Sequence, residues 1–141
     1  MTAIERPDDG QRASLKAISI ALRKLHKSLI DLETQRFGPI GNPFEHLQLV
    51  ATHGQFAWIR LLSELLVELD ERLDEEDNMG PDTLAAYRKV IENLLAPGQE
   101  KQTDFSSKYR AALQESTEVA IAHGALRHLL SSLPGDTITK G

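Results

Sequence analysis

Residues 15–32 read LKAISIALRKLHKSLIDL, and this stretch decides the fold. Its large aliphatic residues recur at alternating spacings of three and four, which places them on one stripe of an α-helix. The stripe consists of Leu15, Ile18, Leu22, Leu25, Leu29 and Leu32. The pattern predicts a helix over about residues 11–36. The helix should end at Phe37-Gly38-Pro39, because glycine accepts a left-handed conformation and proline has no amide hydrogen.

Helical spacing continues through the rest of the chain. Asn42-Pro43 is typical of a helix start and predicts a short helix to about Ala51. Further helices are expected over about residues 55–76, 81–96 and 104–133. Ser116-Thr117 interrupts the last apolar stripe, so that region is either one kinked helix or two helices.

No stretch of alternating apolar and polar residues predicts a strand. The sequence therefore predicts an all-α fold, an antiparallel bundle of four to five helices joined by short connections. We expect a flexible N-terminus over residues 1–10, a single helical-bundle domain over 11–133 and a flexible C-terminal tail over 134–141.

The composition of the 141 residues excludes several classes of function. The chain has no Cys, which excludes disulfides, Cys-ligated metals and thiol catalysis. Its formal net charge of −5 makes nucleic acid an unexpected partner. The first residues lack the order of a signal peptide, and no apolar run is long enough for a membrane span. We therefore expect a cytoplasmic protein that binds neither nucleic acid nor membrane.

The five histidines raise the hypothesis of a metal or haem site. Di-iron bundles use Glu-x-x-His pairs, which do not occur here. His123 and His128 are five residues apart, about 140° around a helix, and cannot share a face. His26 and Asp31 match only one fragment of the hemerythrin-like pattern. We expect no metal and no cofactor.

Catalytic groupings are also absent from the sequence. No phosphate-binding glycine motif occurs, and Ser63 and Ser116 have no histidine at local spacing. No catalytic residue is assigned, and an enzymatic activity stays uncertain and not favoured.

Residues 68–77, ELDERLDEED, form a strongly acidic run at the end of a predicted helix, where negative charge opposes the helix dipole. Reading frames that start at Asp74 or Glu75 do not fit an EF-hand loop. Two interpretations stay open. The run is either a docking site for a basic partner, or it pairs with the basic residues of the first helix, beside residues 12–24 of an antiparallel neighbour.

Aromatic residues gather around the first predicted bend, at Phe37, Phe44, Phe56 and Trp58. They either fill the splayed end of the bundle or form a pocket or partner surface. The segments Asn42-Pro43-Phe44 and FAWIRLLSEL (residues 56–65) resemble small helical proteins of bacterial genomes that have no assigned function. The resemblance extends over about residues 15–75. It implies a soluble, helical bacterial protein and transfers no catalytic or binding residue.

Two function hypotheses follow. The favoured one is a non-catalytic bundle that acts by protein–protein contact, as a regulatory or adaptor protein. The alternative is a small-molecule or metal-binding bundle, with the histidines or Phe56 and Trp58 lining a cavity.

Ile20 supports a protein partner, because it lies about 200° from Ile18 and off the core stripe. Burial against a second copy would remove it from water, which predicts a homodimer through the first helix. Another helix of the same chain could cover Ile20 instead. The candidate interaction or pocket residues are thus Phe44, Phe56, Trp58 and Ile20.

Overall fold

The protein, seen in a computed structural model, is described over residues 9–38, 41–52, 54–75, 80, 82–96 and 104–133. These ranges hold six α-helices and one 3-10 helix, and no strand occurs in them. The helices are α1 (Asp9–Phe37), α2 (Pro43–Thr52), the 3-10 helix η1 (Gly54–Ile59), α3 (Arg60–Asp74), α4 (Thr83–Leu95), α5 (Asp104–Glu115) and α6 (Thr117–Ser131). The predicted all-α fold is confirmed.

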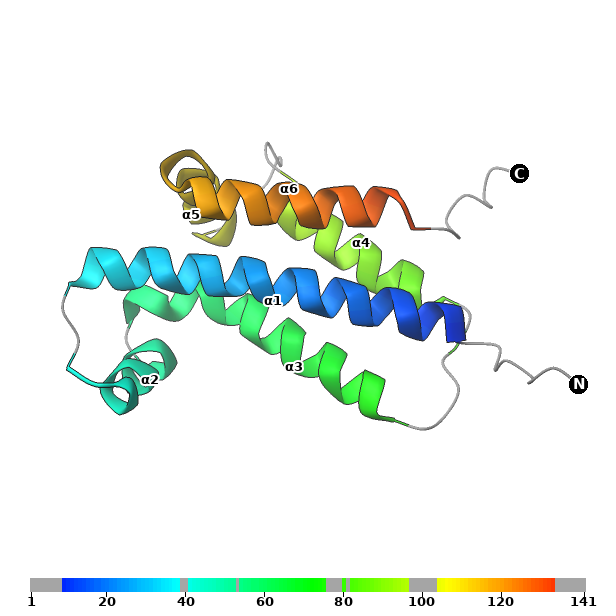
Figure 1. Cartoon of the computed structure of the whole chain (residues 1–141), viewed down its shortest axis with the longest axis horizontal. Helices are drawn as coiled ribbons and strands as arrows, with labels where there is room; N and C mark the ends of the chain where they lie inside the picture. The colour runs from blue at the N-terminus through cyan, green and yellow to red at the C-terminus, as the bar shows by residue number, and fades with distance from the viewer. Residues whose placement is uncertain are drawn as a thin grey trace, which may run out of the picture.

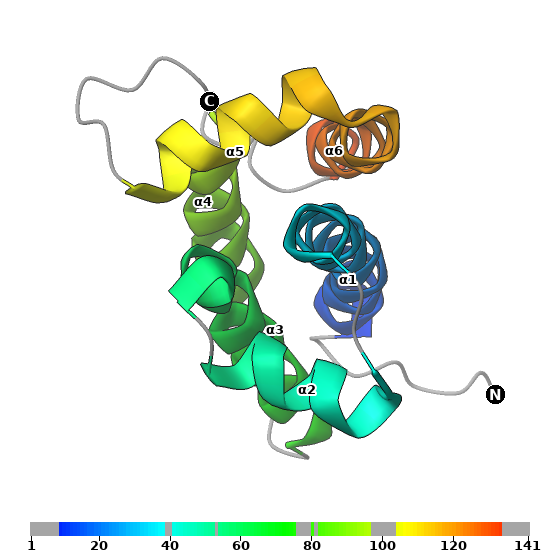
Figure 2. The ribbon, with the colours of Figure 1, turned by 90° about the vertical axis from the view of Figure 1, so that its left-hand side faces the viewer.

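The body of the bundle consists of α1, α3, α4 and α6, and α2 and α5 lie at one end of it (Figure 1). Both α3 and α6 run antiparallel to α1 and pack against it (Figure 1). Seen along the bundle, α1 lies between α3 and α6, and α5 crosses from α4 to α6 (Figure 2). None of the helices over the described ranges has the length and apolar character that a membrane crossing requires.

The core forms around the stripe that the sequence of α1 predicts. All six stripe residues are buried, with exposed fractions between 0% and 9%. The other helices bury apolar side chains against them, and these include Leu62, Leu69, Ile91, Leu95, Leu126 and Leu130. The alternation of three and four residues therefore identifies the buried face of α1 correctly.

Local interactions explain the C-terminal end of α1 and the N-terminal start of α2. Gly38 has φ of 107°, in the left-handed region, and donates its N–H to the Thr34 carbonyl over 3.1 Å. Asn42 caps α2, since its Oδ1 accepts the backbone N–H of Glu45 over 2.9 Å.

Two boundaries differ from the prediction. Residues 9 and 10 belong to α1 and not to a flexible N-terminus, whereas residues 1–8 and 134–141 lie outside the described residues. The helix expected over 55–76 begins as the 3-10 helix η1 and becomes α-helical only at Arg60.

Ser116 separates the last helical region into two helices. Its backbone is extended, with φ of −124° and ψ of 122°, and its hydroxyl accepts the N–H of Val119 over 3.2 Å. Ser116 is therefore the N-cap of α6, which decides between the two alternatives that the sequence left open.

Candidate interaction surface

The acidic end of α3 lies beside the basic first half of α1. Asp70 accepts hydrogen bonds from the Ser19 hydroxyl over 3.1 Å and from the Arg23 guanidinium over 2.8 Å. The hydrogen bond from Arg23 is the main reason that the pKa of Asp70 lies below its ordinary value. Internal pairing, one of the two interpretations of the acidic run, is therefore confirmed at Asp70.

The first turns of α1 also bind the C-terminal end of α3, Gly80 and the first turn of α4. The Arg12 guanidinium donates to the carbonyl oxygens of Leu73 and Glu75 over 3.1 and 2.9 Å, at the C-terminal end of α3. A cation at this end compensates the helix dipole. The Gln11 side chain donates to the Gly80 carbonyl over 2.9 Å and accepts the N–H of Leu84 in the first turn of α4 over 2.8 Å.

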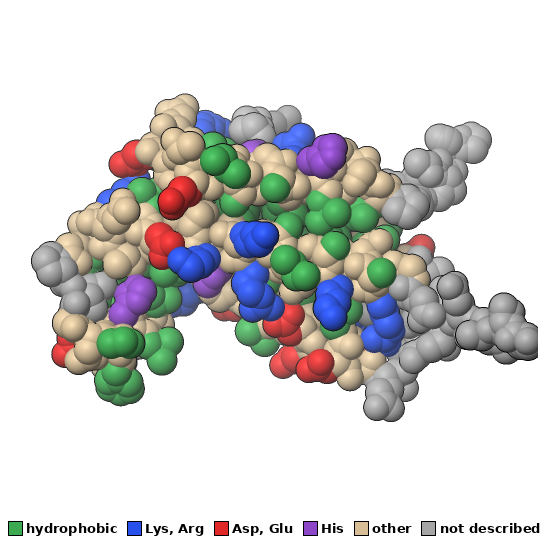
Figure 3. All heavy atoms as spheres, viewed as in Figure 1, with side chains coloured by type: hydrophobic (Ala, Val, Ile, Leu, Met, Phe, Trp, Pro, Cys, Tyr) green, Lys and Arg blue, Asp and Glu red, His purple; other side chains and the backbone are tan. Residues whose placement is uncertain are grey.

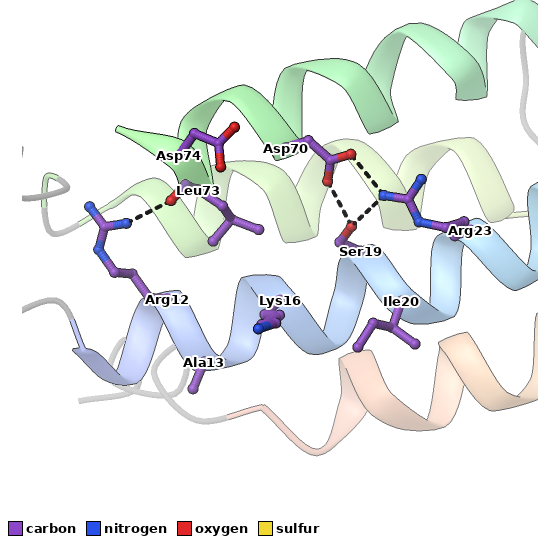
Figure 4. Close-up of a pocket in the computed structure, with 9 residues that line it drawn as sticks. All are labelled: Arg12, Ala13, Lys16, Ser19, Ile20, Arg23, Asp70, Leu73 and Asp74. Carbon is purple, nitrogen blue, oxygen red and sulfur yellow. Dashed lines mark hydrogen bonds and ion pairs between the residues drawn. The ribbon is translucent and has the colours of Figure 1, made fainter. Parts of the chain in front are cut away.

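A groove of about 690 Å³ lies over this junction of α1 and α3 (Figure 4). Its lining is mostly charged and consists of Arg12, Ala13, Lys16, Ser19, Ile20, Arg23, Asp70, Leu73 and Asp74. Ile20 projects from α1 away from Asp70, on the side of α6 (Figure 4). It nevertheless keeps 51% of its surface exposed, so α6 does not cover it as the competing explanation required.

A second exposed apolar surface lies on α2. Phe44 and Leu47 are each 66% exposed, and a space-filling view shows hydrophobic side chains at this end of the molecule (Figure 3). The opposite face of α2 is attached to the bundle. His46 lies 2.9 Å from the Thr34 hydroxyl of α1, and Leu49 and Val50 pack against the core.

Phe56 and Trp58, the other two predicted candidates, are core residues. They are 0% and 5% exposed, and the rings of Trp58 and Phe105 lie 5.6 Å apart between centroids. Neither side chain lines the α1–α3 groove. The interpretation of the aromatic residues as a filled end of the bundle fits Phe56 and Trp58, but not the exposed Phe37 and Phe44.

Three histidines each lie within hydrogen-bond distance of a hydroxyl group on another helix. The pairs are His26 with Ser63 at 2.6 Å, His46 with Thr34 at 2.9 Å and His123 with Tyr109 at 2.7 Å. Burial, followed by the charge of a nearby arginine, lowers the pKa of His26 and of His123. His53 lies outside the described residues. The described part of the chain contains no cluster of three or more His, Asp or Glu side chains that could hold a metal ion.

His26 and Ser63 are the residue types of a general base and a nucleophile, and they lie in contact with each other. A catalytic base also needs a group that orients its other ring nitrogen. No carboxylate among the described residues hydrogen-bonds to His26, and the contact joins α1 to α3. Sequence spacing could not reveal the pair, because the two residues are 37 positions apart.

The chain was compared with models of protein families, with curated proteins and with solved structures, and none of the three comparisons finds a significant match.

Proposed function

We propose that the protein is a non-catalytic regulatory or adaptor bundle that binds another protein through the outer face of α2. The observation that carries this proposal is the exposure of Phe44 and Leu47, which leave 66% of their surfaces in water one helical turn apart. Fully burying a side chain of this kind contributes about 1.5–3 kcal/mol. A partner that covers both residues would therefore gain a useful part of its binding free energy from them.

The spacing of the exposed residues supports a helix-in-groove contact. Phe44, Leu47 and Ala51 are all exposed and follow each other at intervals of three and four residues. Helices that bind into apolar grooves present their anchor residues at such intervals. The flanking Glu45 and Gln48 are exposed and supply a polar rim. The proposed partner is thus a protein with an apolar groove, in the cytoplasmic setting expected from the sequence.

The test is affinity capture from cells that produce the protein, followed by mass spectrometry. Wild type is compared with the double variant Phe44→Glu/Leu47→Glu. The matched control is Ile121→Glu, which alters an equally exposed apolar residue on α6 (67%). We expect a partner that wild type and the control retain and the double variant loses. Equal capture by all three proteins, or no specific capture, contradicts the proposal.

A further inference from the structure

Two exposed stripes with opposite charge lie next to each other on α1 and α3. The stripe on α1 is Lys16, Ile20 and Lys24, and the stripe on α3 is Glu64, Val67 and Glu71. Each stripe thus has a large apolar residue between two charges of one sign. Ile20 is 51% exposed and Val67 is 56% exposed, and the four charged residues are exposed as well.

Both stripes border the α1–α3 groove. Lys16 and Ile20 line it from α1, and Asp70 and Asp74 line it from α3. Val67 and Glu71 each precede one of these aspartates by three residues, so they adjoin the acidic edge of the groove. The space-filling view shows the same separation of charge, with basic side chains along α1 and acidic ones on α3 (Figure 3).

The two stripes also lie at the same level along the axis of the bundle. Ser19 lies beside Asp70 and His26 lies beside Ser63, which fixes the antiparallel register of α1 and α3. With a rise of about 1.5 Å per residue, this register places Ile20 and Val67 within about 3 Å of each other along the helices.

The four charged side chains of these stripes have no partner among the residues that the structure describes. Within the part of the chain that the structure describes, Lys16, Lys24, Glu64 and Glu71 make no hydrogen bond and no ion pair. This sets them apart from their neighbours Arg23 and Asp70, which pair with each other over 2.8 Å.

We infer that this face binds a second copy of the chain, about a two-fold axis that runs along the groove, parallel to α1 and α3. Such an axis exchanges the two helices but leaves heights unchanged, so α1 of each copy lies over α3 of the other. Ile20 then packs on Val67 of the partner subunit. Lys16 faces Glu71 of the partner subunit, and Lys24 faces Glu64 of the partner subunit. Every contact occurs twice.

Charge decides against the simpler dimer in which α1 packs antiparallel on α1 about Ile20. That arrangement places Lys16 opposite Lys24 of the partner subunit, and like charges repel. The arrangement of α1 over α3 brings opposite charges together at both ends of an apolar centre. The proposed surface is separate from the outer face of α2 and does not rest on the function proposed for that helix.

Sedimentation equilibrium at micromolar concentrations tests the inference. Wild type is expected to be a dimer, and Ile20→Glu should raise the dissociation constant at least about tenfold. Phe44→Glu is the control that should leave the dimer unchanged. Circular dichroism verifies that each variant is folded. A monomeric wild type, or an Ile20→Glu variant that dimerises as tightly as wild type, overturns the inference.

Charge reversal distinguishes the two arrangements. Lys16→Glu/Lys24→Glu and Glu64→Lys/Glu71→Lys should each dimerise at least about tenfold more weakly than wild type. Mixed together they should form a heterodimer, because both α1–α3 contacts again join opposite charges. In the α1–α1 arrangement the lysine reversal only exchanges one pair of like charges for another, so double variants that dimerise as tightly as wild type would contradict the inferred arrangement.

A disulfide test is available because the chain has no cysteine of its own. Ile20→Cys and Val67→Cys are prepared as separate proteins and then oxidised, alone and as a mixture. The mixture is expected to give a disulfide-linked species of two chains, and neither protein alone should do so. Efficient self-linking of the Ile20→Cys protein contradicts the inferred contact.

Discussion

Trp58 donates its indole N–H to Oε2 of Glu33 over 2.8 Å, and this bond joins η1 to α1 inside the core. The same carboxylate oxygen accepts a guanidinium N–H of Arg36 over 3.0 Å, and Arg36 also pairs with Glu115 of α5. The side chain of Glu33 is only 4% exposed. At least two donors therefore bind one oxygen of a buried carboxylate, and the network connects three elements at one end of the bundle.

Removal of the Glu33 carboxylate should destabilise the protein. Glu33→Ala leaves the buried Trp58 N–H without its acceptor, and we expect the free energy of unfolding to fall by about 2–3 kcal/mol. Glu33→Gln keeps an acceptor oxygen and should lose about 1 kcal/mol. Urea unfolding followed by the fluorescence of Trp58, the one tryptophan of the chain, measures both variants. Equal losses for the two would mean that the hydrogen bond to Trp58 contributes little.

The sequence alone predicted those features of the fold that depend on residues close to each other in the chain. The spacing of Leu15 to Leu32 identifies the buried face of α1, Gly38 ends that helix in a left-handed conformation, and Asn42 caps the next helix. Each of these features depends on residues within one or two turns of each other, so a pattern of the sequence contains the necessary information.

Features that depend on packing could not be predicted in the same way. Trp58 and Phe44 are both aromatic residues near the first bend, yet one is buried and the other exposed. The partner of each histidine depends on the register of antiparallel helices, as for His26 and Ser63, and one sequence does not fix that register. Antiparallel packing did predict the charge pairing of α3 with α1, but not that Arg12 would bind backbone carbonyl groups.

Stability should fall in mild acid because of His26 and His123. Burial and the nearby charges of Arg23 and Arg127 lower the pKa of these two imidazoles in the folded state. In the unfolded chain a histidine has a pKa of about 6.5, so the unfolded state binds protons first as the pH falls. The stability that the neutral imidazoles contribute is therefore complete above about pH 6.5 and is lost as the pH falls from there through the folded pKa values.

Urea unfolding at a series of pH values measures this dependence. The variant His26→Asn/His123→Asn should have a flatter dependence below about pH 6.5 than wild type. The control His128→Asn changes an exposed histidine and should keep the slope of wild type. A double variant with an unchanged slope would assign the acid sensitivity to other groups.

Loss of Arg12 should loosen the C-terminal end of α3. Its guanidinium binds the carbonyl oxygens of Leu73 and Glu75, so Arg12→Ala removes two hydrogen bonds at one helix end. We expect a loss of about 1 kcal/mol, since the site is partly exposed, and faster amide exchange in the last turn of α3. Arg12→Lys should lie between, because an ammonium group lacks the planar fork of donors. Unchanged exchange in Arg12→Ala would show that α3 ends there without this support.

The break between α5 and α6 should persist without the Ser116 hydroxyl, although at lower stability. Ser116→Ala removes the acceptor for the Val119 N–H, and the loss of such an N-cap costs about 1 kcal/mol. Alanine favours a helix, but the core holds the two segments separately. Phe105, Tyr109 and Ala112 bury the face of α5, and Val119, Leu126 and Leu130 bury that of α6. Fusion into one straight helix would expose one of these faces and lose more free energy than the added helical residue contributes.

Circular dichroism and urea unfolding of two variants test this expectation. The far-ultraviolet circular dichroism of Ser116→Ala should equal that of wild type, and its urea midpoint should be lower. Ser116→Asp should restore the midpoint, because aspartate also caps helices. A rise in both helical signal and stability would mean that the cap, and not the packing of α5, keeps the two helices apart.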